Sequence, residues 1–242
     1  MQQRLPSLLD PPIAFAHRGA RAHARENTME AFRLALRLGA TGLESDVWVS
    51  ADGVPVLDHD GVLGPRWRRR QIGAVDRSDL PDHIPTFDEL LDAIDDDVDL
   101  SLDLKDAGSG PAVIARLRGR STERRSRTWL CAPDRSTLLP LRDEGVRLLD
   151  STRLARIKEG PERRAADLAA EGLDGINLRQ DDWSGGLAAL FHRFGLVAFG
   201  WDLHFEHQLR PALRMGLDAV CGDHVDVMME TYRDELGRPE LP

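Results

Sequence analysis

Short apolar runs alternate with stretches of helical periodicity along the whole chain. The apolar runs, bounded by turn-forming residues, predict eight strands. These strands span residues 13–17, 42–47, 99–105, 128–132, 146–150, 175–178, 196–201 and 219–222. A regular alternation of strands and helices is typical of βα units arranged around a parallel sheet.

Two of the predicted helices have well-marked starts. Asn27 can cap the first, with Glu30 three residues on, and Gly39 ends it. Thr86 and Glu89 have the spacing of a capping box at the start of the second. Six further helices are predicted at residues 110–118, 136–144, 161–171, 184–194, 206–215 and 225–236. Pro140 and Pro211 lie inside two of these and disfavour a regular helix there.

Eight βα repeats in 242 residues predict a TIM (β/α)8 barrel, formed as a single domain over residues 1–242. A doubly wound open sheet is the main rival. No glycine-rich phosphate fingerprint follows any predicted strand, which favours the barrel.

One connection is far longer than an ordinary βα loop. It covers approximately residues 49–85, between the second strand and the helix at Thr86. Residues 51–53 form a turn signal, and residues 54–58 form a short strand that leads to His59. We therefore expect an insertion after strand two, shaped as a hairpin-like extension above the barrel mouth.

Composition excludes some classes of function. The formal net charge of −9 argues against nucleic-acid binding, which requires a basic surface. No apolar run approaches the ~20 residues that span a bilayer, and residues 1–12 do not resemble a secretory signal, so a cytoplasmic location is expected. Cys131 and Cys221 lie in separate strands and are expected to be buried thiols. The oligomeric state stays open.

Ionisable residues recur at the ends of the predicted strands. Glu44 and Asp46 share one strand face because side chains alternate, and so do Asp103 and Lys105. In a barrel, these pairs and His17 would gather at the carboxyl rim, where barrel enzymes place catalysis. Three carboxylates without a thiolate suit one divalent cation, Mg²⁺ or Ca²⁺. A solvated strand end, or pairing with Arg18 and Lys105, is the alternative for either carboxylate alone.

These groups suit phosphodiester cleavage. Arg18 and Lys105, with the metal, could neutralise the phosphate oxygens, while histidines move protons near neutral pH. Trp201 is either an apolar wall for the substrate or a filler of the barrel top. Trp67 lies among arginines that could contact an anionic headgroup, namely Arg66, Arg68, Arg69 and Arg70. These are too few for stable membrane anchoring.

The chain resembles the glycerophosphodiester phosphodiesterase family. The matching segments are His17-Arg18-Gly19, Glu26-Asn27-Thr28, Gly39-Ala40, Glu44-Ser45-Asp46-Val47, Asp52-Gly53, His59-Asp60, Ile84-Pro85-Thr86 with Asp88-Glu89-Leu90, and Asp103-Leu104-Lys105. After residue 105 the resemblance is sparse, with Trp201 and residues 216–223 as later matches. It implies a TIM barrel with an insertion, a divalent metal held by Glu44, Asp46 and Asp103, and His17 and His59 as acid and base.

Two departures from the family pattern bear on activity and substrate. Asp103 stands where the family usually has Glu, so one ligand is a methylene shorter. Trp201-Asp202-Leu203-His204 replaces the common Trp-Thr-Val-Asn, which alters the surface that meets the alcohol. The resemblance implies hydrolysis of small glycerophosphodiesters to glycerol phosphate and an alcohol. The alternatives are a lysophospholipase-D-like enzyme, which needs an apolar groove near Trp67 and Trp201, and a noncatalytic phosphate-binding barrel.

Overall fold

Eight parallel strands close into a barrel in the computed structural model, which describes residues 4–65 and 67–237. The barrel strands are β1 Ile13–His17, β2 Gly42–Val49, β6 Asp99–Leu104, β7 Thr128–Ala132, β8 Arg147–Thr152, β9 Gly175–Arg179, β10 Val197–Trp201 and β11 Ala219–Gly222. Each pairs with its neighbour in chain order, and β1 closes the ring by pairing with both β2 and β11. The predicted barrel and all eight predicted strands are confirmed, and the open sheet is excluded.

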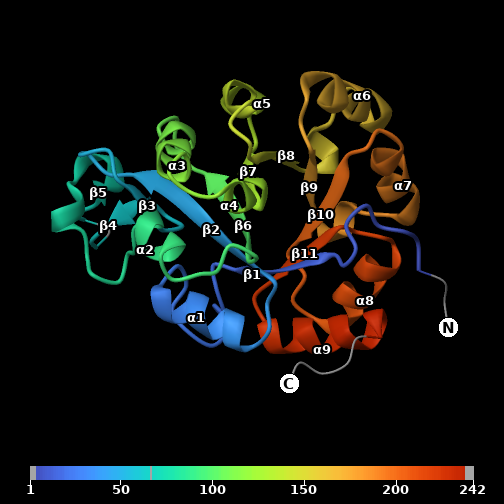
Figure 1. The fold of residues 1–242 in the computed structure, drawn as a ribbon, viewed down its shortest axis with the longest axis horizontal. Coiled ribbons are helices and arrows are strands. Elements are labelled where there is room, and N and C mark those ends of the chain that lie inside the picture. The colour runs from blue at the N-terminus through green and yellow to red at the C-terminus, as the bar shows by residue number, and fades with distance from the viewer. Residues whose placement is uncertain (1–3, 66, 238–242) are drawn as a thin grey trace.

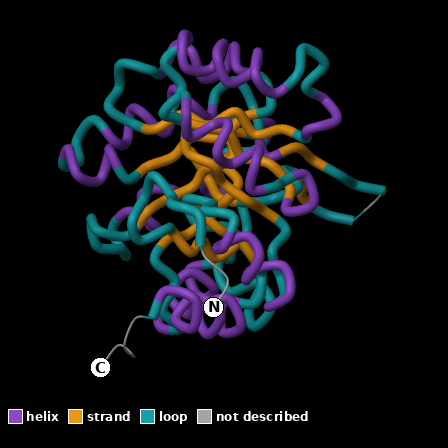
Figure 2. The backbone as a smooth tube through the Cα atoms, turned by 90° about the vertical axis from the view of Figure 1, so that its right-hand side faces the viewer, coloured by secondary structure: helices purple, strands orange, loops and turns teal. Residues whose placement is uncertain are grey.

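Helices surround the strands on the outside of the barrel (Figures 1 and 2). They are α1 Met29–Arg37, α2 Phe87–Leu91, α3 Ser109–Leu117, α4 Thr122–Ser126, α5 Arg135–Leu138, α6 Pro161–Glu171, α7 Gly185–Arg193, α8 Glu206–Arg214 and α9 Val225–Leu236. The capping box at Thr86 is present. The short helix α4 was not predicted. Pro140 lies in a 3-10 turn that follows α5, so the helix predicted at residues 136–144 is much shorter than expected.

The cap of α1 differs from the prediction. Thr28, and not Asn27, is the N-cap residue, and its hydroxyl accepts a hydrogen bond of 3.2 Å from the backbone N–H of Ala31. Asn27 has a φ of 51° and is buried, with its side chain directed to the strand ends. Both residue types are good caps, so local preference could not separate them.

Apolar side chains fill the barrel beneath the carboxyl rim. Alternation along each strand sends one set of residues inward, where Phe15, Trp129 and Phe199 are the bulky members of a buried cluster. The other set packs outward against the helices in a larger continuous core. The lower half of the barrel is therefore solid, and only its upper rim is left for polar groups.

The predicted insertion is present after β2. Strand β3 Pro55–Leu57 pairs antiparallel with the end of β2, and β4 Val62–Leu63 pairs with β5 Arg70–Gln71. Two 3-10 turns follow, at Ile72–Ala74 and Arg77–Asp79. The insertion has its own small apolar cluster, which includes Val56, Ile72 and Ile84. It extends from the side of the barrel where β2 ends (Figure 1). Arg66 lies outside the described residues.

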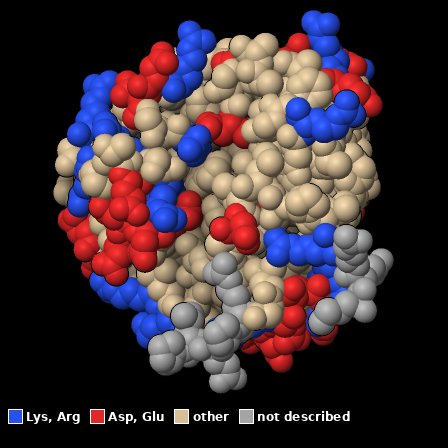
Figure 3. Space-filling view, turned by 45° about the vertical axis from the view of Figure 1, so that its right-hand side comes forward, with Lys and Arg blue, Asp and Glu red and all other residues tan. Residues whose placement is uncertain are grey.

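Two other sequence expectations, and the distribution of surface charge, can be compared with the structure. Both cysteines are free thiols; Cys131 is buried as expected, Cys221 is only half-buried, and burial raises the pKa of each. Across residues 4–65 and 67–237, none of the helices combines the length and apolar character that a bilayer crossing requires. Acidic and basic side chains are interspersed on the face drawn in Figure 3.

Candidate active site

A pocket of about 280 Å³ opens at the carboxyl end of the barrel. All eight site residues predicted from the sequence line it, namely His17, Arg18, Glu44, Asp46, His59, Asp103, Lys105 and Trp201. The other lining residues are Phe15, Ser101, Ser151, Asn177, Phe199, Gly200, Asp202, Ala219 and Cys221. Groups that are up to 206 residues apart in the sequence, Phe15 and Cys221, therefore share one cavity.

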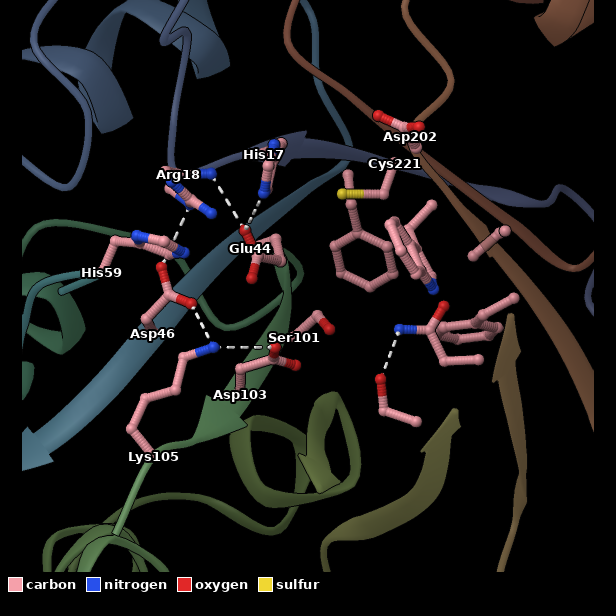
Figure 4. A pocket seen from close by; sticks show the side chains of 17 residues that line it. His17, Arg18, Glu44, Asp46, His59, Ser101, Asp103, Lys105, Asp202 and Cys221 are labelled. Atoms are coloured by element: carbon pink, nitrogen blue, oxygen red, sulfur yellow. Dashed lines mark hydrogen bonds and ion pairs between the residues drawn. The ribbon is translucent and has the colours of Figure 1, made fainter. Parts of the chain in front are cut away.

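Strand register explains why the polar groups meet. His17 on β1 lies opposite Glu44 on β2, and Glu44 lies opposite Ser101 on β6. One step further along the same strands, Asp46 lies opposite Asp103. Positions two residues apart point to the same face, so both levels face the barrel interior (Figure 4).

The three carboxylates form one cluster. Glu44, Asp46 and Asp103 each offer an oxygen, and these oxygens lie within 4.8 Å of one another. Burial, reinforced by the charges of Asp46 and Asp103, raises the pKa of Glu44 well above its usual range. Burial also raises the pKa of Asp103. For Asp46, burial acts in the same direction, but Lys105 and Arg18 outweigh it and lower the pKa.

Two cations partly balance this negative charge. Lys105 Nζ lies 2.7 Å from an oxygen of Asp46 and 3.2 Å from an oxygen of Asp103. Arg18 Nε lies 3.2 Å from Asp46, and the backbone N–H of Arg18 donates to Glu44 at 3.0 Å. Glu26 also pairs with the Arg18 guanidinium, at 3.1 Å. If all three carboxylates of the cluster were ionised, their combined negative charge would exceed the positive charge of Lys105 and Arg18.

The donor set fits a divalent cation. The cluster supplies oxygen ligands only, which suits Mg²⁺ or Ca²⁺ better than a soft metal. Burial raises the pKa of Glu44, and the neighbouring Asp46 and Asp103 raise it further, so an added cation would favour the ionised form of that carboxyl. Glu44, Asp46 and Asp103 are the residues that could hold it.

His17 is held by a carboxylate that the sequence did not single out. Its Nδ1 lies 2.6 Å from an oxygen of Asp223, which directly follows β11, and its Nε2 lies 3.8 Å from Glu44. Burial of Asp223 opposes ionisation, but the hydrogen bond and charge of His17 outweigh it and lower the pKa of Asp223. Because a carboxylate can only accept, Nδ1 carries the proton of the neutral ring and Nε2 is left free to face the pocket.

His59 reaches the pocket from the segment after β3 and is more open to solvent. Its side chain is 39% exposed, and its Nδ1 lies 2.8 Å from Asp60. The insertion therefore contributes one of the two histidines, while the barrel itself contributes the other.

Asn27 is another contributor whose role was not predicted. Its side-chain N–H donates to Asp46 at 3.1 Å, and its carbonyl oxygen accepts from the Ser45 hydroxyl at 2.7 Å. The local sequence around Asn27 predicts only a helix cap. Asp223 carried the same signal as the other site acids, an acidic residue at the end of a barrel strand.

The opposite wall of the pocket is formed by Trp201 and its neighbours. Phe15 and Phe199, which lie 5.7 Å apart between ring centroids, add apolar surface to the pocket. Asp202, at a departure from the family pattern, lies at the rim and pairs with Arg179 at 2.6 Å. Trp67 is 87% exposed and does not line the pocket. The pocket that contains Trp201 therefore does not extend to Trp67.

Comparison with known proteins confirms the family resemblance. Residues 17–107 match the model of the glycerophosphoryl diester phosphodiesterase family. The matched segment contains seven of the eight predicted site residues, all except Trp201. Glycerophosphodiester phosphodiesterase 1 of Rattus norvegicus is 52% identical over 54 residues, which are 22% of this chain and 16% of that protein.

A longer match is to the probable glycerophosphodiester phosphodiesterase 2 of Mycobacterium tuberculosis. It is 38% identical over 108 residues, which cover 40% of each chain. The matched segments thus span well under half of these relatives' own lengths.

Solved structures match over nearly the whole chain. A putative glycerophosphoryl diester phosphodiesterase from Silicibacter pomeroyi has a TM-score of 0.80, with 22% identity and 96% of each chain covered. An Oleispira antarctica phosphodiesterase, solved in complex with the product sn-glycerol-3-phosphate, has a TM-score of 0.77 and 19% identity, with 91% of this chain and 96% of that chain covered. At these identities the likeness establishes the fold.

Proposed function

We propose that this protein hydrolyses glycerophosphodiesters to a glycerol phosphate and an alcohol, as a single barrel domain that depends on one divalent cation. The observation that carries the proposal is the cluster of Glu44, Asp46 and Asp103, which shares a pocket with two histidines and two cationic side chains. The family match over residues 17–107 supports the same activity.

The substrate phosphate would bind in the pocket above the carboxylate cluster, beside the cationic side chains. Glu44, Asp46 and Asp103 would hold a Mg²⁺ or Ca²⁺ ion, which supplies positive charge to the nonbridging oxygens when bound. Arg18 and Lys105 would orient the phosphate by charge-assisted hydrogen bonds. Trp201 would form the apolar wall beside the alcohol part of the substrate.

The two histidines would carry the proton transfers. One accepts a proton from the attacking hydroxyl, and the other donates a proton to the departing alkoxide, so that no strong base or alkoxide is released. Asp223 holds His17 with Nε2 facing the pocket, which suits either role. His59 would supply the second group from the insertion.

The test is an assay of the purified full chain with glycerophosphocholine and glycerophosphoethanolamine in Mg²⁺ or Ca²⁺. Glycerol phosphate should be released, and EDTA followed by dialysis should abolish the activity until the cation is restored. His17→Ala and His59→Ala should each lower kcat by at least ~100-fold. His83→Ala is the matched control and should keep normal activity.

Two results would refute the proposal. Full activity after removal of divalent cations would exclude the metal role of the three carboxylates. Cation binding by the folded chain without hydrolysis of any diester would favour a noncatalytic barrel. Faster hydrolysis of lysophosphatidylcholine than of glycerophosphocholine would instead place the enzyme in the lysophospholipase-D-like class.

A further inference from the structure

Two histidines and an aspartate outside the pocket form a second cluster of potential metal ligands. His23 lies in the loop after β1, and His224 and Asp226 lie at the start of α9. One ligand atom from each lies within 4.8 Å of the other two, and His23 Nε2 is already 3.0 Å from Asp226 Oδ1. No member of this cluster lines the candidate active site.

We propose that His23, His224 and Asp226 bind one Zn²⁺ or similar transition-metal ion. Zinc takes imidazole nitrogen at ~2.0 Å and carboxylate oxygen at ~2.1 Å in a tetrahedral arrangement, which separates ligand atoms by roughly 3.4 Å. From separations of at most 4.8 Å, the ligand atoms need to close by no more than about 1.4 Å, and the 3.0 Å contact between His23 and Asp226 needs to open slightly, to meet that geometry. Two imidazoles and one carboxylate also leave a fourth position for water.

The donor chemistry separates this site from the carboxylate cluster in the pocket. Imidazole nitrogen favours zinc and other late transition metals, whereas Glu44, Asp46 and Asp103 offer oxygen only and suit Mg²⁺ or Ca²⁺. One protein can therefore hold two different cations, each selected by its own ligands.

The surroundings of the second cluster allow an ion to bind. The side chains of His23 and Asp226 are 36% and 50% exposed, so an ion can reach them from solvent. The ring of Phe205 stacks on His224 at 5.9 Å between centroids, which restricts the orientation of that imidazole.

A metal at this position would join the first and last βα units of the barrel. His23 follows the strand that carries His17, and His224 directly follows Asp223, the partner of His17. The backbone N–H of Ala22 already donates to the carbonyl of Asp223 at 3.4 Å. The ion would thus fix the seam where the ring of strands closes, beside the active site and without contact to substrate.

The experiment uses the full chain, stripped of bound metals and then supplied with excess Mg²⁺ so that the oxygen site is occupied. Zn²⁺ is then titrated in and followed by calorimetry, and Co²⁺ is titrated in and followed by visible absorption. The wild type should bind one ion, show the intense visible band of a tetrahedral cobalt site, and melt at a higher temperature with zinc. His224→Gln and His23→Gln should each weaken binding by at least about tenfold and lose the band.

His83→Gln, a histidine of the insertion, is the control and should bind as the wild type does. Without added zinc, the melting temperatures of the variants should match that of the wild type. A loss of zinc binding can then be attributed to the missing ligand and not to a damaged fold. Unchanged zinc binding in both cluster variants, or no binding by the wild type, would overturn the proposal and leave the His23–Asp226 contact as a simple ion pair. Hydrolysis of glycerophosphodiesters is a separate readout, and its presence or absence does not decide this one.

Discussion

Asp223 determines which nitrogen of His17 faces the pocket. Its carboxylate accepts the Nδ1–H at 2.6 Å, which leaves Nε2 with a lone pair on the substrate side. The side-chain amide of an asparagine at this position could donate a hydrogen bond to Nδ1, which would favour the tautomer that carries its proton on Nε2. We predict that Asp223→Asn lowers kcat by at least about tenfold with little change in KM, because the substrate contacts remain.

The measurement is steady-state hydrolysis of glycerophosphocholine over a range of pH. The change of tautomer should also alter the pH profile of kcat, which a merely structural defect would not do. Asp181→Asn, at the same rim but outside the pocket lining, is the control. Equal pH profiles and rates for Asp223→Asn and the wild type would show that this carboxylate does not position His17.

The contribution of Asp103 to cation binding can be tested by substitution. Its side chain offers one oxygen to the carboxylate cluster, and Lys105 lies 3.2 Å away. We predict that Asp103→Asn weakens Mg²⁺ or Ca²⁺ binding by at least about tenfold, because the neutral amide is a poorer ligand for a hard cation. Asp103→Glu keeps the charge and adds one methylene of reach, so it should bind the cation at least as tightly as the wild type.

Both variants are compared by the cation concentration that gives half-maximal activity and by calorimetric titration. If Asp103→Asn required no more cation than the wild type, Asp103 would not be a ligand. The two variants also separate the effect of charge from that of side-chain length. Glutamate keeps the charge of Asp103 and changes its length, whereas asparagine keeps its length and removes its charge.

At the scale of elements, the short helix α2 depends on its cap. Thr86 Oγ1 accepts from the Glu89 N–H at 3.1 Å, and Glu89 accepts from the Thr86 N–H at 2.7 Å. A five-residue helix has few internal hydrogen bonds, so these two satisfy much of its first turn. We predict that Thr86→Ala lowers the free energy of unfolding by about 1 kcal/mol. Urea denaturation checks this, with the exposed Ser136→Ala in α5 as the control; equal midpoints for both variants would contradict it.

Strands were predictable because their signal is local. Apolar runs such as residues 128–132 and 219–222 are buried on both faces, so no other element fits them, and the structure has strands at the same positions. The helix α4 has only five residues, Thr122–Ser126, which is too few to show a helical period. It is fixed instead by Arg124, whose buried guanidinium donates to the carbonyls of Asp95 and Val98.

The part of the candidate site that could be predicted consists of residues at the ends of strands in the first half of the chain. Side-chain alternation places Glu44 with Asp46 whatever the partner strands are. The contact of His17 with Asp223 spans 206 residues and exists only because the barrel closes, so no local pattern predicts it. Asn27 illustrates the other failure, since its burial against Asp46 is a tertiary demand that overrides its local preference for a cap.

At the scale of the whole molecule, closure of the barrel and assembly of the site are one event. The first strand carries His17 and pairs with the last strand, after which Asp223 follows directly. The apolar interior beneath the rim leaves little freedom in this register, because a shift of one residue would turn every inward side chain outward. Stability of the ring as a whole therefore determines whether the candidate active site exists.

Asp150 makes that stability depend on pH. It lies on β8, is 0% exposed, and faces Arg164 of α6 at 3.3 Å. Burial, only partly offset by Arg164, raises the pKa of Asp150 to about 6. Between the unfolded and folded values the folded state holds a proton that the unfolded state has lost, so this group stabilises the fold at low pH and loses that contribution as pH rises through about 6.

We predict that the free energy of unfolding of the wild type, relative to that of Asp150→Asn, falls by roughly 1–2 kcal/mol between about pH 5 and about pH 7. Asparagine cannot ionise, so the difference between the two proteins removes the contributions of other titrating groups that they share. Urea denaturation at several pH values measures it. A difference that stays constant over this range would mean that Asp150 is already ionised in the folded protein at about pH 5, and that Arg164 compensates its burial in full.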